Sequence, residues 1–541
     1  MTATATRATG ARFAPRTGGS RQLAGTGALL RLALRRDRVM IPVWVLVIGL
    51  MVTSGSGSIE QFYDTEAERD SLVRSLMTNG SLRAMYGPVF DDSVGALVAW
   101  RFGVFAAVLT AVMSLMIVIR HTRDEEESGR QELISSAAVG RRAPLTAALL
   151  AAAVANAVVA LIIAGGLSGQ DAGGALALGL AVGGVGMMFA GMAAIMAQFT
   201  ESARPARGLT AAVLGVAFVL RAAGDASTSD GSSVLTWLSP LGWAENVRPF
   251  AAERWWVLLL IAVAVVAQGA IAYVLAGRRD VGMSFLPSRP GSAEGRIATA
   301  GGLAWRLQRG SVLSWSVGFF LAGVVFGGMT DGVADLVGDN EDAREIFERM
   351  GGQSGLTNAF LAAMVGILGL IAGLYVVQSV LRLNSEETSQ RAEPVLANAV
   401  GRLRWASGHL VIAFGGAALI MPAGGLGLAL GHGKDFGPVL GASLIQLPAV
   451  WVLGGFAVLL YGAFPKAATA AWAVAGLSLA LGWIGPALEI PQWLMNLSPF
   501  GHLPKLPGAE VVWAPVVAMT VVAFALVAAG LAGLRRRDVL S

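Results

Sequence analysis

Long apolar segments separated by short polar ones dominate this chain of 541 residues, and only 14% of the residues are charged. Soluble proteins carry nearer a quarter of charged residues, whereas each apolar segment here can cross the ~30 Å hydrocarbon core of a bilayer as a helix. The pattern predicts an all-α polytopic membrane protein with about twelve transmembrane helices, at about residues 39–53, 97–119, 143–165, 172–199, 209–223, 257–276, 312–329, 356–380, 405–430, 439–461, 467–484 and 512–534.

A short charged element follows the second apolar segment and returns, at the same internal spacing, after the eighth. The first copy is Asp124–Glu132 (DEEESGRQE), which runs on to Ala138–Arg141 (AVGR). The second copy is Ser385–Glu393 (SEETSQRAE), which runs on to Ala399–Arg402 (AVGR). The repetition indicates that the chain is internally duplicated.

Three further features recur in the same order and define the halves. They are a basic segment before the first span (27–38 and 305–309), a Leu-Ser-Pro turn (238–240 and 497–499) and an Arg-Asp-Val exit (279–281 and 537–539). A Pro-, Gly- and Ser-rich basic linker lies between the halves. We therefore predict a disordered cytoplasmic tail at 1–26, a six-helix half at 27–286, a cytoplasmic linker at 287–300 and a second six-helix half at 301–541. Because six is even, the halves would be parallel rather than inverted repeats.

Arginines gather in the loops after the even-numbered spans, and the opposite loops are richer in Asp and Glu. By the positive-inside rule, these loops and both termini would be cytoplasmic in a multi-pass protein of the cell membrane. Topology then accounts for the net charge of +5 without a nucleic-acid partner. The basic segment Gly27–Arg38 has two interpretations, an amphipathic helix on the inner membrane surface or the charged flank of the first span.

The charged element has a structural and a functional interpretation. Glu126 precedes Arg130 by four residues, as Glu387 precedes Arg391, so we expect an ion pair along each short helix. Such a pair contributes only ~0.2–0.5 kcal/mol, too little to explain why the whole pattern occurs twice. One copy alone favours a solvated cap, whereas two copies favour a docking surface for two identical partner subunits.

The sequence Glu-Glu-x-Ser-Gly-Arg between the second and third spans of a six-span half resembles permeases of type-2 ATP-binding-cassette (ABC) exporters. The doubled version, with Arg391–Pro394 (RAEP) and the Arg-Asp-Val exits, is similar to the actinobacterial antibiotic, polyketide or tetronasin-like exporters. This resemblance implies that the loop is a coupling helix that contacts the nucleotide-binding subunit. It assigns to that contact Glu125, Glu126, Gly129, Arg130, Glu132, Glu386, Glu387, Arg391 and Glu393.

The resemblance has one departure and one further implication. Gln390 stands where the first half has Gly129, which puts an equal shape of the two docking sites in doubt. In the resembled family the cargo path lies between spans two and five of each half. The candidate liners are then Phe102, Phe105, Met113 and Met116, although ordinary helix packing explains these residues equally well.

The sequence lacks the features of several other sites. It contains no Gly-x-x-x-x-Gly-Lys-Ser/Thr loop, so ATP and magnesium are expected on a separate ABC ATPase, in two copies, and no cofactor in this chain. The four histidines have no metal-ligand spacing, and no metal site is predicted. Polar residues of the spans are expected to bond neighbouring helices (Asn156, Gln268, Gln378 and Gln446) or to snorkel to the interface (Arg101 and Arg221).

We therefore predict a non-enzymatic permease subunit of an ABC exporter that moves hydrophobic natural products, antibiotics or drugs out of the cell. No Asp, Glu or Lys lies in the middle of a predicted span, which favours an apolar or amphipathic cargo over a proton relay. A proton-coupled multidrug transporter is one alternative, but the Gly-x-x-x-Asp-Arg-type loop that it predicts is absent. A non-transport membrane scaffold is the other, and the sequence is less able to exclude it.

Overall fold

The computed structural model describes residues 22–135, 139–280, 282–286, 295, 297–330, 355–484 and 491–537. Within these ranges every regular element is a helix, and 11 helices are long and apolar enough to cross a membrane. This confirms the all-α polytopic fold. Contacts divide the chain into two units, Met1–Asp70 with Tyr86–Arg289 and Ser71–Met85 with Pro290–Ser541. We describe each unit by itself.

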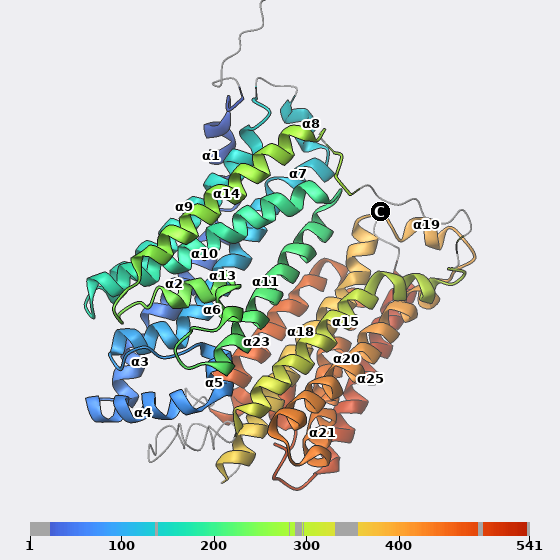
Figure 1. The fold of residues 1–541 in the computed structure, drawn as a ribbon. Helices are drawn as coiled ribbons and strands as arrows, with labels where there is room; N and C mark the ends of the chain where they lie inside the picture. The colour runs from blue at the N-terminus through green and yellow to red at the C-terminus, as the bar shows by residue number, and fades with distance from the viewer. Residues whose placement is uncertain are drawn as a thin grey trace, which may run out of the picture. The chain divides into compact units, whose positions relative to one another are not determined.

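In the first unit, α10 (Ala172–Phe199) packs against α6, α9, α11 and α14. Its many glycines and alanines allow neighbouring backbones to approach closely. Short helices gather at the two ends of these long ones: α1, α7 and α8 at one end and α3 at the other (Figure 1). The bounds are α1 Thr26–Arg36, α2 Met40–Thr53, α3 Gly55–Phe62, α6 Val94–Arg120, α7 Arg123–Glu127, α8 Arg130–Ser135, α9 Ala143–Leu167, α11 Ala203–Ser227, α12 Val234–Trp237, α13 Pro240–Asn246 and α14 Trp255–Arg278.

The basic segment before the first span forms a helix of its own, α1, which packs along α9. The chain breaks between α1 and α2 at the buried residue Asp37. Its carboxylate accepts a hydrogen bond from His121 at 2.6 Å and forms an ion pair with Arg120 at 2.9 Å, both at the end of α6. Just before α1, the carbonyl of Ala24 accepts a hydrogen bond from the Gly140 amide at 2.9 Å. The end of the predicted tail is therefore held against the loop that precedes α9.

In the second unit, α18 (Leu356–Thr388) is the most enclosed long helix and packs against α20, α22 and α23. The helix α15 lies along α20, and α22 lies along α25. The bounds are α15 Ala300–Gly328, α19 Glu393–Leu396, α20 Arg402–His432, α21 Phe436–Ile445, α22 Leu447–Ala463, η2 Pro465–Ala470, α23 Ala471–Ile484, α24 Gln492–Met495, η3 Pro499–His502 and α25 Trp513–Arg536. Two short helices precede them, α4 (Glu66–Thr78) and α5 (Gly80–Tyr86), and the division cuts both: residues up to Asp70 and from Tyr86 belong to the first unit.

Two predicted spans of the second half differ from the structure. The seventh begins at Ala300 rather than near residue 312, because its basic segment continues the same helix. The eleventh, predicted at 467–484, begins as a 3-10 helix and continues as α23, which is described as far as Ile484; residues 485–490 lie outside the described ranges. The described part of the chain therefore has 11 candidate spans rather than twelve. One of the loops rich in Asp and Glu, at residues 331–350, lies outside the described residues.

Candidate functional site

In the first unit, the charged loop is joined to the end of α14 by a buried ion pair. Arg279 donates two hydrogen bonds to Glu126, from Nη2 to Oε1 at 2.7 Å and from Nη1 to Oε2 at 2.8 Å. Arg141, which begins the return toward α9, donates to the backbone carbonyl of Arg279 at 2.8 Å. We call Glu126, Arg141 and Arg279 the first clasp. It joins three motifs that recur in both halves of the sequence.

The second unit repeats this arrangement. Arg537 donates to Glu387 from Nη1 to Oε1 at 2.6 Å and from Nη2 to Oε2 at 2.8 Å. Arg402 donates to the backbone carbonyl of Arg537, as Arg141 does to that of Arg279. We call Glu387, Arg402 and Arg537 the second clasp. The hydroxyl of Tyr461 on α22 adds a third hydrogen bond to Glu387, at 2.6 Å.

Both clasps need arginine rather than lysine, because only the planar guanidinium presents two parallel donors to a carboxylate. The side chains are shielded from solvent. Glu126 is 7% exposed and Glu387 only 1%. Removing one partner of such a pair leaves an uncompensated buried charge, which costs far more than the loss of a surface pair.

The predicted pairs between Glu126 and Arg130 and between Glu387 and Arg391 are wrong. Arg130 instead bonds Glu125, with Nε to Oε2 at 2.9 Å, and Arg391 bonds Glu386 at 3.2 Å. The reason is that neither helix continues through the loop, because the backbone turns into the left-handed region just before each arginine. The pairs therefore join residues five apart. The next glutamate of each loop, Glu126 or Glu387, faces inward and forms the clasp.

The same turn resolves the one departure between the two copies. Gly129 has φ 71° and Gln390 has φ 58°, so the glutamine adopts the conformation that the glycine favours. The two loops therefore turn in the same way at this position.

The structure divides the predicted contact residues into a buried group and an exposed group. Glu126 and Glu387 lie beneath the surface in the clasps, and Glu386 is also buried. Glu125 is partly buried and also pairs with Arg36 of α1. The residues open to solvent, which we call the exposed row, are Arg130, Glu132, Arg391 and Glu393.

The sequence model of the C-terminal domain of multidrug efflux system permease Rv1217c matches residues 27–273 and 297–535 of this chain. The chain belongs to this permease family. It is also 42% identical, over 527 residues and 95% of each chain, to the multidrug efflux system permease protein Rv1217c of Mycobacterium tuberculosis strain ATCC 25618 / H37Rv.

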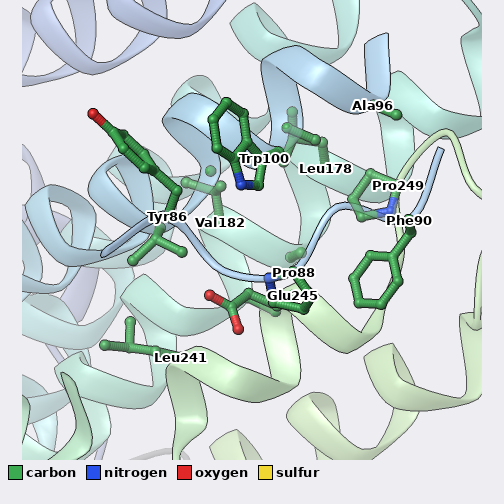
Figure 2. Close-up of a pocket in the computed structure, with 15 residues that line it drawn as sticks. Tyr86, Pro88, Phe90, Ala96, Trp100, Leu178, Val182, Leu241, Glu245 and Pro249 are labelled. Atoms are coloured by element: carbon green, nitrogen blue, oxygen red, sulfur yellow. The ribbon is translucent and has the colours of Figure 1, made fainter. Parts of the chain in front are cut away.

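This permease also has a pocket on α6, at the end of that helix away from the first clasp. Tyr86, Trp100, Leu241 and Glu245 are among its lining residues, and Figure 2 shows them around it. The Trp100 indole N–H donates to the Gly87 carbonyl at 3.0 Å, which fixes the orientation of its ring. The ring of Tyr86 lies 4.9 Å from it.

The four predicted cargo-path residues lie on α6 but do not line this pocket. Phe102 is half-buried against Gly55 of α3, and Phe105 lies edge-on to Tyr86 with ring centroids 5.7 Å apart. Met113 is buried and Met116 is exposed. Neighbouring α6 residues line the pocket instead, namely Ala96, Ala99, Trp100, Gly103 and Val104.

Arg221 does not snorkel as predicted. It is fully buried on α11 and pairs with Asp225 at 3.4 Å and with Glu245 at 3.0 Å. The prediction was wrong because α11 extends beyond the predicted end at residue 223, and because Glu245 comes from another helix, α13. The prediction that amides of the spans bond neighbouring helices is confirmed for Asn156 of α9, which donates to Ser114 of α6 at 2.9 Å.

The left-handed turn gives a test of the loop. Gly129→Ala is expected to lower the free energy of unfolding by about 1 kcal/mol, because no atom crowds a Cβ there and only the backbone conformation resists it. The reciprocal change Gln390→Gly is not expected to lower the free energy of unfolding. Chemical unfolding in detergent micelles would measure both free energies. An unchanged free energy of unfolding for Gly129→Ala would contradict the left-handed turn at this position.

Proposed function

We propose that this permease exports hydrophobic natural products, antibiotics or drugs from the cell. In this proposal a separate ABC ATPase, in two copies, supplies the energy and contacts the exposed row of each loop. Both termini and both loops are then cytoplasmic. The observation that carries the proposal is the recurrence of the clasp, because two matched loops suit two identical subunits.

Contacts of the first loop support a role in transmitting force. Besides the clasp to the end of α14, Glu127 accepts a hydrogen bond from the Ala203 amide at 2.8 Å, and Asp124 pairs with Arg207. Both of these partners lie in the first turns of α11. A push on α7 would therefore act on α6, α11 and α14 together.

The second loop is tied in a similar way. Glu387 is held by Arg537, just past α25, and by Tyr461 on α22. The Arg537 guanidinium also lies 4.9 Å from the centroid of the Tyr461 ring. A displacement of this loop would act on α18, α22 and α25. The similar Mycobacterium tuberculosis protein is a multidrug efflux permease, which supports drugs as the cargo.

Proton coupling is a second candidate, which the buried carboxylates of Asp225 and Glu245 favour. Two features weigh against it. Arg221 compensates one of the two charges, and the matched clasps have no role in such a mechanism. An experiment that separates the energy sources decides between the candidates.

The test is ethidium uptake into inverted membrane vesicles from cells that make the permease and its native partners. We expect uptake on addition of ATP, inhibition by vanadate and no effect of a protonophore. Vesicles from cells without the permease are the control. Uptake that is driven by a proton gradient without ATP would overturn the proposal and support the second candidate.

A further inference from the structure

The pocket beside α6 contains a buried carboxylate oxygen that is not used by the ion pair next to it. Arg221 binds Oε1 of Glu245, while Oε2 has no hydrogen-bond partner among the described residues. The Glu245 side chain is 9% exposed and lines the pocket. A buried acceptor without a donor is destabilising, so the pocket suits a ligand that supplies one.

The charges of the cluster define the ligand. Arg221 carries one positive charge, whereas Asp225 and Glu245 carry two negative charges when both are ionised. The three named groups then sum to one negative charge, which one positive charge would balance. Burial raises the pKa of Glu245 well above its usual value; Arg221 only partly opposes this, and the neighbouring Asp225 carboxyl adds to the rise. Either a proton or a bound cation can supply that positive charge.

The walls of the pocket favour a cation over a proton alone. Tyr86 and Trp100 present aromatic rings, whose faces attract ammonium groups. Gly87 leaves space for the carboxylate, because a Cβ there would lie 2.7 Å from Oε1 of Glu245. The cavity, about 40 Å³, has room for a small head group.

We propose that this pocket binds the protonated ammonium head of an amphipathic amine, with Glu245 Oε2 as the acceptor and Tyr86 and Trp100 beside it. The inference deepens the proposed export function by naming a class of cargo. Binding to the permease itself needs neither ATP nor a partner, so the two proposals can fail separately.

A similar pocket in the second unit has the opposite charge. It lies beside the second Leu-Ser-Pro turn and is lined by Phe500, Gln446 and Lys505. Burial lowers the pKa of Lys505, but a protonated lysine there would repel an ammonium head. The preference for amines therefore belongs to the first unit, and Lys505 provides a matched control.

The test is binding of phenethylammonium to the full-length permease in nanodiscs at pH 8, with phenethyl alcohol as the uncharged analogue. We expect the amine to bind more tightly than the alcohol. Glu245→Gln should weaken amine binding at least about tenfold, which corresponds to one charge-assisted hydrogen bond. Lys505→Gln should not weaken it. Equal affinity for the amine and the alcohol, or an unchanged affinity of Glu245→Gln for the amine, would overturn the inference.

Two further measurements keep the test decisive. If Glu245→Gln does not fold, Trp100→Leu should reduce amine affinity several-fold by removing a ring, and unchanged affinity would refute the site. Lowering the pH should weaken amine binding to the wild type as Glu245 takes up a proton. The charged or titratable groups that face Glu245 are Arg221 and Asp225 of α11 and Tyr86 of α5, and the lining residues of α6 and α10 include none.

Discussion

Glu387→Ala is expected to lower the free energy of unfolding by about 3–5 kcal/mol, the largest stability effect that we predict for a single substitution. The substitution would leave the Arg537 guanidinium, whose side chain is 14% exposed, without the carboxylate that it binds twice. Tyr461 would also lose its acceptor. Chemical unfolding in detergent micelles would measure the loss.

Two variants give this prediction its controls. Glu393→Ala, in the same loop but exposed, should change the unfolding free energy by no more than about 0.5 kcal/mol. Replacing Glu387 and Arg537 together by leucine should restore most of the stability, because no buried charge remains. A cost for Glu387→Ala that is no greater than for Glu393→Ala would show that the second clasp is not a buried pair.

The double substitution Arg130→Glu with Arg391→Glu is expected to reduce ATP-driven ethidium uptake at least about tenfold, with the permease still inserted and folded. Both arginines are exposed, and the glutamates that they contact keep a second arginine partner, Arg36 or Arg382, so their reversal should alter docking more than stability. Charge reversal at an interface acts on association by repulsion, and a factor of ten corresponds to about 1.4 kcal/mol. Uptake rates in inverted vesicles, normalised to the amount of permease, would measure the effect.

Arg404→Glu is the matched control, because this exposed arginine lies in the first turn of α20 and outside both loops. It should leave uptake nearly unchanged. Each single reversal should retain part of the activity if both loops are used. Full activity of the double variant would remove the docking role of the exposed row.

Much of the fold followed from composition and repetition. Apolar length located 11 of the twelve predicted spans, since any helix in a bilayer must satisfy the same length and polarity. The eleventh predicted span was different, because apolar composition between residues 467 and 484 does not reveal that its first turn is a 3-10 helix. Recurrence also identified Arg279 and Arg537 as features that occur in both halves.

The partners of the charged residues could not be predicted in the same way. Helical spacing assigned Glu126 to Arg130, whereas Glu126 pairs with Arg123 on its other side and with Arg279, more than a hundred residues away. A repeated motif shows that a residue is used twice but not what it contacts. The same limit applies to one partner of Arg221: Asp225 lies four residues along the same helix, but Glu245 lies on a different helix.

The most direct test of the account is cross-linking from single cysteines at equivalent positions of the two loops, Ser128→Cys and Ser389→Cys. The chain has no cysteine of its own, and both serines are exposed. In inverted vesicles with the native partners, we predict that each cysteine cross-links to the same nucleotide-binding chain, one that carries the phosphate-binding loop absent here. Cross-linking of neither position, or labelling of both only from the outer side of the membrane, would contradict the account.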